Sequence, residues 1–124
     1  MKSEPGTTVL IVEDELFVRM IGADALEEAG YRVMEAASAD EALAILERAD
    51  NVQVLFTDIR MPGSMDGLTF AKVVHERWPN IRILLTSGDT HPSTDAIPDD
   101  GRFLPKPYRF DSLSRELTTL LDQQ

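Results

Sequence analysis

Five polar side chains of the kinds that handle phosphate and metal ions stand at the ends of short apolar runs. They are Glu13, Asp14, Asp58, Thr86 and Lys106, which follow or close the runs at residues 8–12, 52–57, 81–86 and 102–105. Three clustered carboxylates repel one another, so a site that unites them needs a divalent cation, and Mg²⁺ prefers oxygen ligands. A carboxylate is also a nucleophile in phosphoryl transfer, where a lysine and a hydroxyl stabilise the charge of the transition state. These residue types therefore indicate Mg²⁺-assisted transfer of a phosphoryl group to an aspartate.

The order of the apolar patterns predicts a fold that would bring these residues together. Short apolar runs predict strands at residues 8–12, 31–36, 52–57, 81–86 and 102–105. Amphipathic patterns predict helices between the first four strands and after the fifth. Strands that alternate with helices form a parallel sheet, and ligands bind at the carboxyl ends of its strands. Pro105 donates no hydrogen bond to a neighbouring strand, which predicts an edge position for the fifth strand.

The helix boundaries carry signals of their own. Gly30 follows the first helical pattern as a C-cap, Ser38 precedes Glu41 in a capping-box pattern, and Asp66 is a candidate N-cap. One apolar stripe per helix is expected to face the sheet. The stripes are Val18, Ile21, Ala25 and Ala29 in the first helix, Ala39, Ala42, Leu43, Leu46 and Ala49 in the second, Leu68, Ala71 and Val74 in the third, and Phe110, Leu113, Leu117, Leu120 and Leu121 in the last.

The segment from residue 89 to residue 101 lacks the pattern of a regular helix. Pro92 and Pro98 interrupt it, and Ala96 and Ile97 are its clearly apolar side chains. Because helices in proteins are stabilised mainly by packing an amphipathic face, we expect a short helical turn or an irregular, mobile loop there. A dimer built on a full helix at this position should be weak or absent, so we expect a monomer or a weak dimer.

Composition narrows the class of protein. The 124 residues fit one domain, 1–124, with an ordered core expected at about 7–122. The sequence has no cysteine for a disulfide, a thiol nucleophile or a zinc site, and no run in it predicts a signal peptide or a membrane span. We therefore expect a soluble, cytoplasmic protein. The net charge of −10 argues against direct binding to nucleic acid, which favours a basic protein face.

The ordered motifs resemble the receiver domain of response regulators over essentially the whole chain. The motifs are Glu13-Asp14, Asp58 in TDIRMPGSMDG, Thr86 in LLTSG, and Lys106-Pro107. Each motif alone is unspecific, whereas the complete set in this order is specific. The resemblance implies a doubly wound, flavodoxin-like α/β fold with strand order 2-1-3-4-5. It also implies a protein of two-component signalling, which takes a phosphoryl group from a histidine kinase or a histidine phosphotransfer protein and then controls a downstream protein partner.

The resemblance also assigns a role to each acidic residue. Asp58 would be the phosphoacceptor and would contribute to a Mg²⁺ site, for which Mn²⁺ is an alternative ion. Asp14 would bind the metal directly and Glu13 would bind it through a water molecule. The main-chain carbonyl of Arg60 would be a further ligand.

The resemblance implies that the remaining site residues bind the phosphoryl group or change conformation in response to it. Lys106 would pair with it, and Thr86 would turn its hydroxyl toward it. Phe103 corresponds to an aromatic residue whose rotation follows Thr86, although a core side chain fits the same position. The Lys106–Pro107 peptide bond would be cis. Such a protein catalyses its own phosphorylation and dephosphorylation and is not otherwise an enzyme.

Other functions use some of the same residue types. A haloacid-dehalogenase-like phosphatase also has a nucleophilic aspartate and Mg²⁺, but it needs a second aspartate where Arg60 stands. A flavodoxin-like cofactor protein needs a phosphate-binding loop, where Glu13, Asp14 and Glu15 would repel phosphate. The sequence is also compatible with an interaction module that has lost phosphorylation, and with a receiver fragment of a hybrid histidine kinase or a larger regulator.

Overall fold

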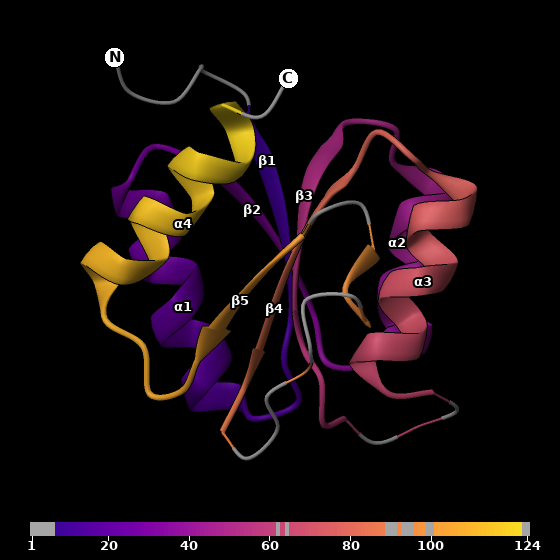
Figure 1. The fold of residues 1–124 in the computed structure, drawn as a ribbon, viewed down its shortest axis with the longest axis horizontal. Coiled ribbons are helices and arrows are strands. Elements are labelled where there is room, and N and C mark those ends of the chain that lie inside the picture. Colours follow the sequence, from indigo (N-terminus) through magenta and orange to yellow (C-terminus); the bar gives the residue numbers. More distant parts are fainter. Residues whose placement is uncertain are drawn as a thin grey trace.

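Five parallel strands form one sheet in the order β2-β1-β3-β4-β5, which confirms the predicted fold (Figure 1). The computed structural model describes residues 7–61, 63, 65–88, 92, 96–98 and 101–122. The strands are β1 (Thr8–Val12), β2 (Arg32–Ala36), β3 (Val52–Asp58), β4 (Arg82–Ser87) and β5 (Arg102–Pro105). The helices are α1 (Leu16–Glu28), α2 (Ala39–Arg48), α3 (Gly67–Arg77) and α4 (Phe110–Asp122).

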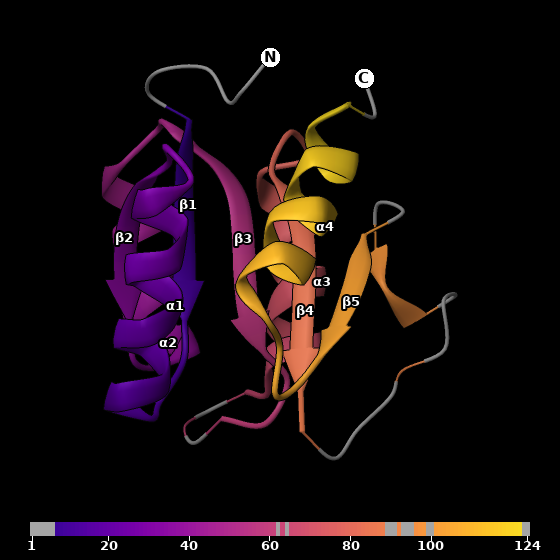
Figure 2. The same ribbon diagram turned by 90° about the vertical axis from the view of Figure 1, so that its left-hand side faces the viewer.

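Helices cover both faces of the sheet, as Figures 1 and 2 show: α1 and α4 lie on one face, and α2 and α3 lie on the other. The apolar side chains of the central strands alternate between two buried clusters, because successive residues of a strand point to opposite faces. Leu10, Leu55 and Leu85 belong to the cluster under α2 and α3. Their strand neighbours Val9, Val54 and Leu84 belong to the cluster under α1 and α4.

The predicted helix ends are confirmed. The hydroxyl of Ser38 accepts a hydrogen bond from the N–H of Glu41, and the carboxylate of Asp66 accepts one from the N–H of Thr69. Gly30 follows α1 with a φ of 100°, a conformation that glycine adopts without strain. It donates to the carbonyl of Glu27, and the next residue donates to the carbonyl of Leu26, which together form a Schellman motif.

The apolar stripe predicted for α1 is partly confirmed and wrong at Ile21. Ala25 and Ala29 pack against the cluster under α1 and α4, but Ile21 is 68% exposed. The helix buries Gly22, Ala23 and Leu26 instead. The physical reason is close packing rather than hydrophobicity. A Cβ on Gly22 would lie 2.7 Å from Cδ1 of Ile11 and 2.9 Å from the hydroxyl of Tyr108, so a glycine there lets the helix approach the sheet. The need for a glycine at this position carries no apolar signal in the sequence.

The stripe predicted for the last helix needs one correction. Leu113, Leu117 and Leu120 of α4 are buried as expected, and Leu121 packs partly against them. Phe110, however, is 48% exposed. It is the first residue of α4 and precedes the turns that lie on the sheet.

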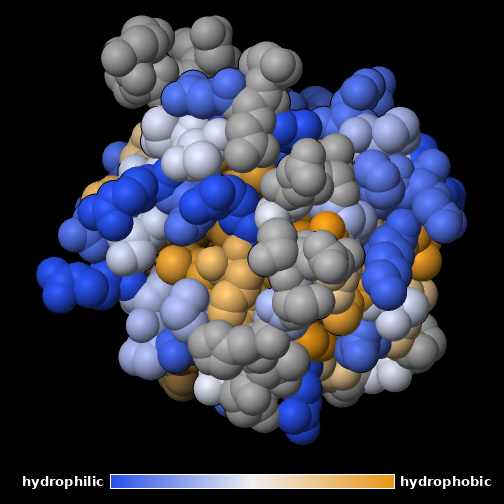
Figure 3. Space-filling view, in the orientation of Figure 1, coloured by the Kyte–Doolittle hydropathy of each residue, from blue (hydrophilic) through white to orange (hydrophobic). Residues whose placement is uncertain are grey.

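Between β4 and β5 the structure describes Gly88, Pro92, residues 96–98 and Gly101, and none of them lies in an α-helix. Ile97 is buried in the cluster under α2 and α3. The rest of the predicted irregular segment lies outside the described residues. In the view of Figure 1, hydrophobic surface gathers in the middle of the molecule, over β5, as Figure 3 shows.

Among the helices of the described chain, none is long and apolar enough to cross a membrane.

Candidate functional site

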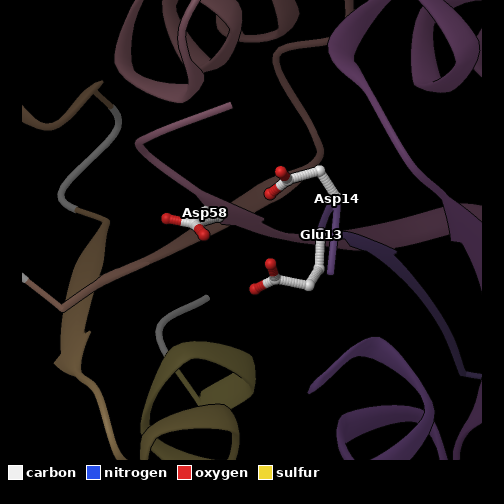
Figure 4. A group of neighbouring side chains, drawn as sticks. All are labelled: Glu13, Asp14 and Asp58. Atoms are coloured by element: carbon white, nitrogen blue, oxygen red, sulfur yellow. The ribbon is translucent and has the colours of Figure 1, made fainter. Parts of the chain in front are cut away.

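The acidic residues singled out from the sequence come together at the carboxyl ends of β1 and β3. Ligand oxygens of Glu13, Asp14 and Asp58 lie within 4.8 Å of one another. Figure 4 shows the three carboxylates arranged around one space, two from the end of β1 and one from the end of β3. Glu13 and Asp58 are buried, whereas Asp14 is exposed. The cluster therefore has two fixed, desolvated carboxylates and one that faces the solvent.

Lys106 balances the two buried carboxylates. Its Nζ donates to Oε1 of Glu13 at 2.6 Å and to Oδ2 of Asp58 at 2.8 Å. Burial raises the pKa of Glu13, and the hydrogen bonds from Lys106 and from the N–H of Glu15 offset only part of that rise. Burial lowers the pKa of Lys106, but its hydrogen bonds to Asp58 and Glu13 outweigh burial, so that pKa is raised overall. The raised pKa keeps Lys106 charged.

Backbone contacts fix the orientation of Asp58. The N–H of Ile59 donates to the carbonyl of Thr86 at 2.9 Å, which ties the end of β3 to β4. The N–H of Arg60 donates to Oδ1 of Asp58 at 3.1 Å. The start of α3 packs directly on this turn, because a Cβ on Gly67 would lie 1.9 Å from the carbonyl oxygen of Asp58. One oxygen of Asp58 is thus held by a backbone N–H and the other by Lys106.

The family model for the response regulator receiver domain matches residues 9–118. The chain belongs to this family. The receiver domain is 39% identical over 121 residues to the sensor kinase CckA of Brucella abortus, covering 94% of this chain and 13% of that protein. It is 32% identical to the response regulator receiver protein CpdR of the same organism, covering 91% of this chain and 95% of CpdR. The chain thus spans a small part of CckA and nearly all of CpdR.

Solved structures of receiver domains have the same fold. The receiver domain of the hybrid histidine kinase CckA superposes with a TM-score of 0.80 at 34% identity, covering 93% of this chain and 99% of that one. The response regulator TrrA of Thermotoga maritima, solved with Mg²⁺ and BeF, superposes with a TM-score of 0.80 at 27% identity, covering 92% and 98% of the two chains. These similarities agree with the fold described above.

Thr86 and Phe103 of the receiver domain lie on neighbouring strands. Thr86 is buried at the end of β4, and among the described residues its hydroxyl has no hydrogen-bond partner. Phe103 is partly buried in β5 and pairs in register with Leu85, while Thr86 pairs with Leu104. A buried hydroxyl beside Asp58 suits an incoming oxygen ligand. The Lys106–Pro107 peptide bond is cis, as the resemblance implied.

The sequence analysis missed one residue of this site, Arg19. Its guanidinium donates to the main-chain carbonyl of Glu13 at 2.8 Å and to the carboxylate of Glu35 at 3.1 Å. It therefore ties α1 to the turn that carries the two acidic residues and to the end of β2. The sequence signal for it was a single arginine that follows the acidic run at 13–15 in a helix with no other basic residue.

We expect Arg19→Ala to weaken Mg²⁺ binding by about tenfold, because residues that orient metal ligands typically have effects of this size. The direction of the change in Mg²⁺ affinity distinguishes a positioning role from a charge effect. Removing a nearby positive charge would by itself strengthen the binding of a cation. Titration calorimetry with Mg²⁺ measures the affinity. Arg77→Ala is the matched control, because Arg77 pairs with Glu47 at the surface and should not affect Mg²⁺ binding. Unchanged or tighter binding in Arg19→Ala would contradict the positioning role.

The acidic cluster opens into a cavity of about 470 Å³. Its lining combines the three clustered carboxylates and Lys106 with neighbouring charged residues, one apolar residue of α1 and the glycine that follows β4. The lining residues are Glu13, Asp14, Glu15, Val18, Asp58, Arg60, Gly88 and Lys106. Arg60 is one of the lining residues, and its backbone carries the carbonyl that the resemblance assigns to the metal.

Proposed function

We propose that this receiver domain accepts a phosphoryl group on Asp58 from a phosphorylated histidine of a kinase or a phosphotransfer protein. The observation that carries the proposal is the arrangement around Asp58. One of its oxygens accepts from the N–H of Arg60, the other accepts from Lys106, and two further carboxylates lie within 4.8 Å. Such a carboxylate is oriented as a nucleophile and is surrounded by groups that bind phosphate and Mg²⁺.

The transfer exchanges one bond to phosphorus for another. An oxygen of Asp58 attacks the phosphorus and the P–N bond to the donor imidazole breaks. The imidazole takes up a proton from the solvent and leaves as a neutral base. Lys106 stabilises the charge on the phosphoryl oxygens, and the hydroxyl of Thr86, which has no partner among the described residues, donates to one of them. Asp14, Asp58 and the carbonyl of Arg60 would hold Mg²⁺, with Glu13 acting through a water molecule. When bound, this ion neutralises charge that the carboxylates and the phosphoryl group share.

The phosphorylated state would then control a protein partner. Thr86 turning toward the phosphoryl group empties space at the edge of the sheet, into which Phe103 would rotate. We infer a cytoplasmic signalling protein that acts as a monomer or a weak dimer and does not contact nucleic acid directly. It would turn over only its own phosphoryl group and no separate substrate. The proposal is the same whether this domain makes up nearly a whole protein, the case matched by CpdR, or one part of a larger kinase, the case matched by CckA.

Intact-mass spectrometry after incubation with acetyl phosphate and Mg²⁺ tests the proposal directly. We expect a gain of about 80 Da, the mass of one phosphoryl group, and no gain when EDTA removes the metal. Peptide mapping should locate the modification in the segment that contains Asp58. Absence of a Mg²⁺-dependent gain would contradict the proposed function.

A further inference from the structure

Lys106 reaches the acceptor site from a part of the chain that lies just beyond the end of β5. Its N–H donates to the carbonyl of Ser87 at 2.9 Å, whereas the next residue, Pro107, has no N–H to donate. The Nζ of Lys106 nevertheless lies 2.6 Å from a carboxylate oxygen of Glu13 and 2.8 Å from one of Asp58. A lysine side chain loses much rotamer freedom when it is held in one conformation, so the backbone that carries it has to be well placed.

The side chain of Tyr108, two residues after Lys106, is anchored in the core. Its ring packs edge-on against Phe56, with ring centroids 5.5 Å apart, and contacts the cluster under α1 and α4. Its hydroxyl reaches α1, where a Cβ on Gly22 would lie 2.9 Å from it. A tyrosine side chain has only two rotatable bonds before its hydroxyl, so a fixed ring also restrains the backbone to which it is attached. Tyr108 therefore fastens the segment after β5 to β3 and to α1.

The contact of Tyr108 with Phe56 lies beside the contact of Lys106 with Asp58. Phe56 and Asp58 are two residues apart in β3, so their side chains point to the same face of the sheet. Lys106 and Tyr108 are also two residues apart in the sequence. The segment after β5 is thus linked to β3 at two neighbouring points, one of which is apolar and the other charged.

From this arrangement we propose that Tyr108 is a positioning residue for Lys106. The place of its ring between Phe56 and Gly22 fixes the backbone from which the lysine reaches Asp58. The inference rests on the proposed function, in which the ammonium group of Lys106 stabilises the phosphoryl oxygens. Such stabilisation is effective when the charged group is held in place before the reaction. Gly22 is part of the arrangement, because a side chain there would push the tyrosine hydroxyl away from α1.

The variants Tyr108→Ala and Tyr108→Phe test the role of the ring. Without the ring, we expect labelling of Asp58 by acetyl phosphate and Mg²⁺ to slow about tenfold or more, because a misplacement of about 1 Å can reduce a rate a hundredfold. Tyr108→Phe keeps the contact with Phe56 and should be labelled at close to the wild-type rate. Titration calorimetry should show no loss of Mg²⁺ affinity in either variant, because the three carboxylates stand on β1 and β3 and not on the displaced segment.

A second series of variants keeps the aromatic ring and displaces it. Chain neighbours and the backbone of its own helix aside, a Cβ at residue 22 would come within 4 Å of two atoms of the described residues, Cδ1 of Ile11 and the hydroxyl of Tyr108. The series is therefore made in Ile11→Val, which lacks the first of these atoms. Adding Gly22→Ala should slow the labelling. Adding Tyr108→Phe as well should restore the rate of Ile11→Val, because the colliding hydroxyl is gone.

The position of Lys106 can also be measured without phosphorylation. A small amine-acylating reagent should modify Lys106 more slowly than the exposed Lys72 of α3, because the ammonium group of Lys106 is paired with two carboxylates and its side chain is 21% exposed. In Tyr108→Ala, we expect the acylation of Lys106 relative to Lys72 to rise several-fold. Peptide mapping by mass spectrometry measures this ratio.

Leu26→Ala is the control for stability, because it leaves a cavity under α1 away from Tyr108 and should not change the labelling rate while the protein is folded. Wild-type labelling of Tyr108→Ala, or an equal defect in Leu26→Ala, would overturn the proposal. If Tyr108→Ala does not fold, the Ile11→Val series decides: no defect from Gly22→Ala, or no rescue by Tyr108→Phe, would overturn it.

Failure of this inference and failure of the proposed function give different results. If acetyl phosphate labels the wild type and all variants equally and the acylation ratio stays constant, the positioning role of Tyr108 fails alone. If acetyl phosphate does not label the wild type, the proposed function fails. The acylation ratio of Lys106 to Lys72 then decides by itself whether Tyr108 holds Lys106 in place.

Discussion

The variant Asp58→Asn is expected to gain no phosphoryl group at residue 58 under conditions that label the wild type fully. An amide at this position is neither an anionic nucleophile nor a good ligand for Mg²⁺, so both the attack on phosphorus and the binding of the cation are lost. The loss of labelling should be complete, because the other buried carboxylate cannot readily replace Asp58 as the nucleophile. Both oxygens of Glu13 already accept hydrogen bonds, one from Lys106 and one from the N–H of Glu15. Intact-mass spectrometry with acetyl phosphate and Mg²⁺ measures it.

Asp66→Asn is the matched control for this experiment. Asp66 lies in the same loop region and caps α3, and asparagine is an equally good N-cap, so both the fold and the labelling should be retained. Circular dichroism would verify that Asp58→Asn is folded. Labelling of Asp58→Asn at another residue, at the rate and extent of the wild type, would show that the acceptor is assigned wrongly.

The variant Asp14→Ala is expected to lose the stabilisation that Mg²⁺ gives the wild type. A ligand that binds only the folded state stabilises it by about 2.7 kcal/mol at a hundred times its Kd, which shifts the melting temperature by roughly 10 °C in a domain of this size. Asp14 is the exposed member of the cluster and would be a direct ligand. Without Mg²⁺, the variant should melt no lower than the wild type, because one repelling carboxylate is gone.

Thermal melts with and without Mg²⁺ measure both effects. Glu15→Ala is a stringent control, because Glu15 is the next residue, is exposed and lines the same cavity, but lies outside the cluster of three carboxylates. Its removal changes the net charge equally and should leave most of the response to Mg²⁺. If Glu15→Ala and Asp14→Ala responded alike, general acidity rather than ligation would explain the stabilisation.

Much of the site was predictable because its residues stand at strand ends. An apolar run followed at once by a carboxylate or a lysine identifies both the strand and the edge of the sheet to which the side chain belongs. This reasoning brought together Glu13, Asp14, Asp58 and Lys106, which the structure shows in contact or close proximity. The caps at Ser38 and Asp66 were predictable for a similar reason, since each depends on a local contact three residues away.

The errors arose where packing depends on shape. The inner face of α1 is built on Gly22, Ala23 and Leu26, so Ile21, which was expected to face the sheet, is left exposed. Arg19 was overlooked because its two partners, the carbonyl of Glu13 and the carboxylate of Glu35, belong to different parts of the sheet. A pattern read along the chain cannot reveal a contact that depends on how a helix is seated on a sheet.

The position of β5 at the edge of the sheet has a mechanical consequence. β1 and β3, which carry the carboxylates, are hydrogen-bonded to strands on both sides, whereas β5, which leads into Lys106, is paired with β4 alone. The carboxylates thus stand on strands held from both sides, whereas Lys106 follows a strand held from one side. On the proposed phosphorylation of Asp58, we expect the side that carries Lys106 to move more than the side that carries the carboxylates, because fewer backbone hydrogen bonds oppose its movement. The β5 edge of the sheet is then where we expect a chemical change at Asp58 to alter the surface of the domain.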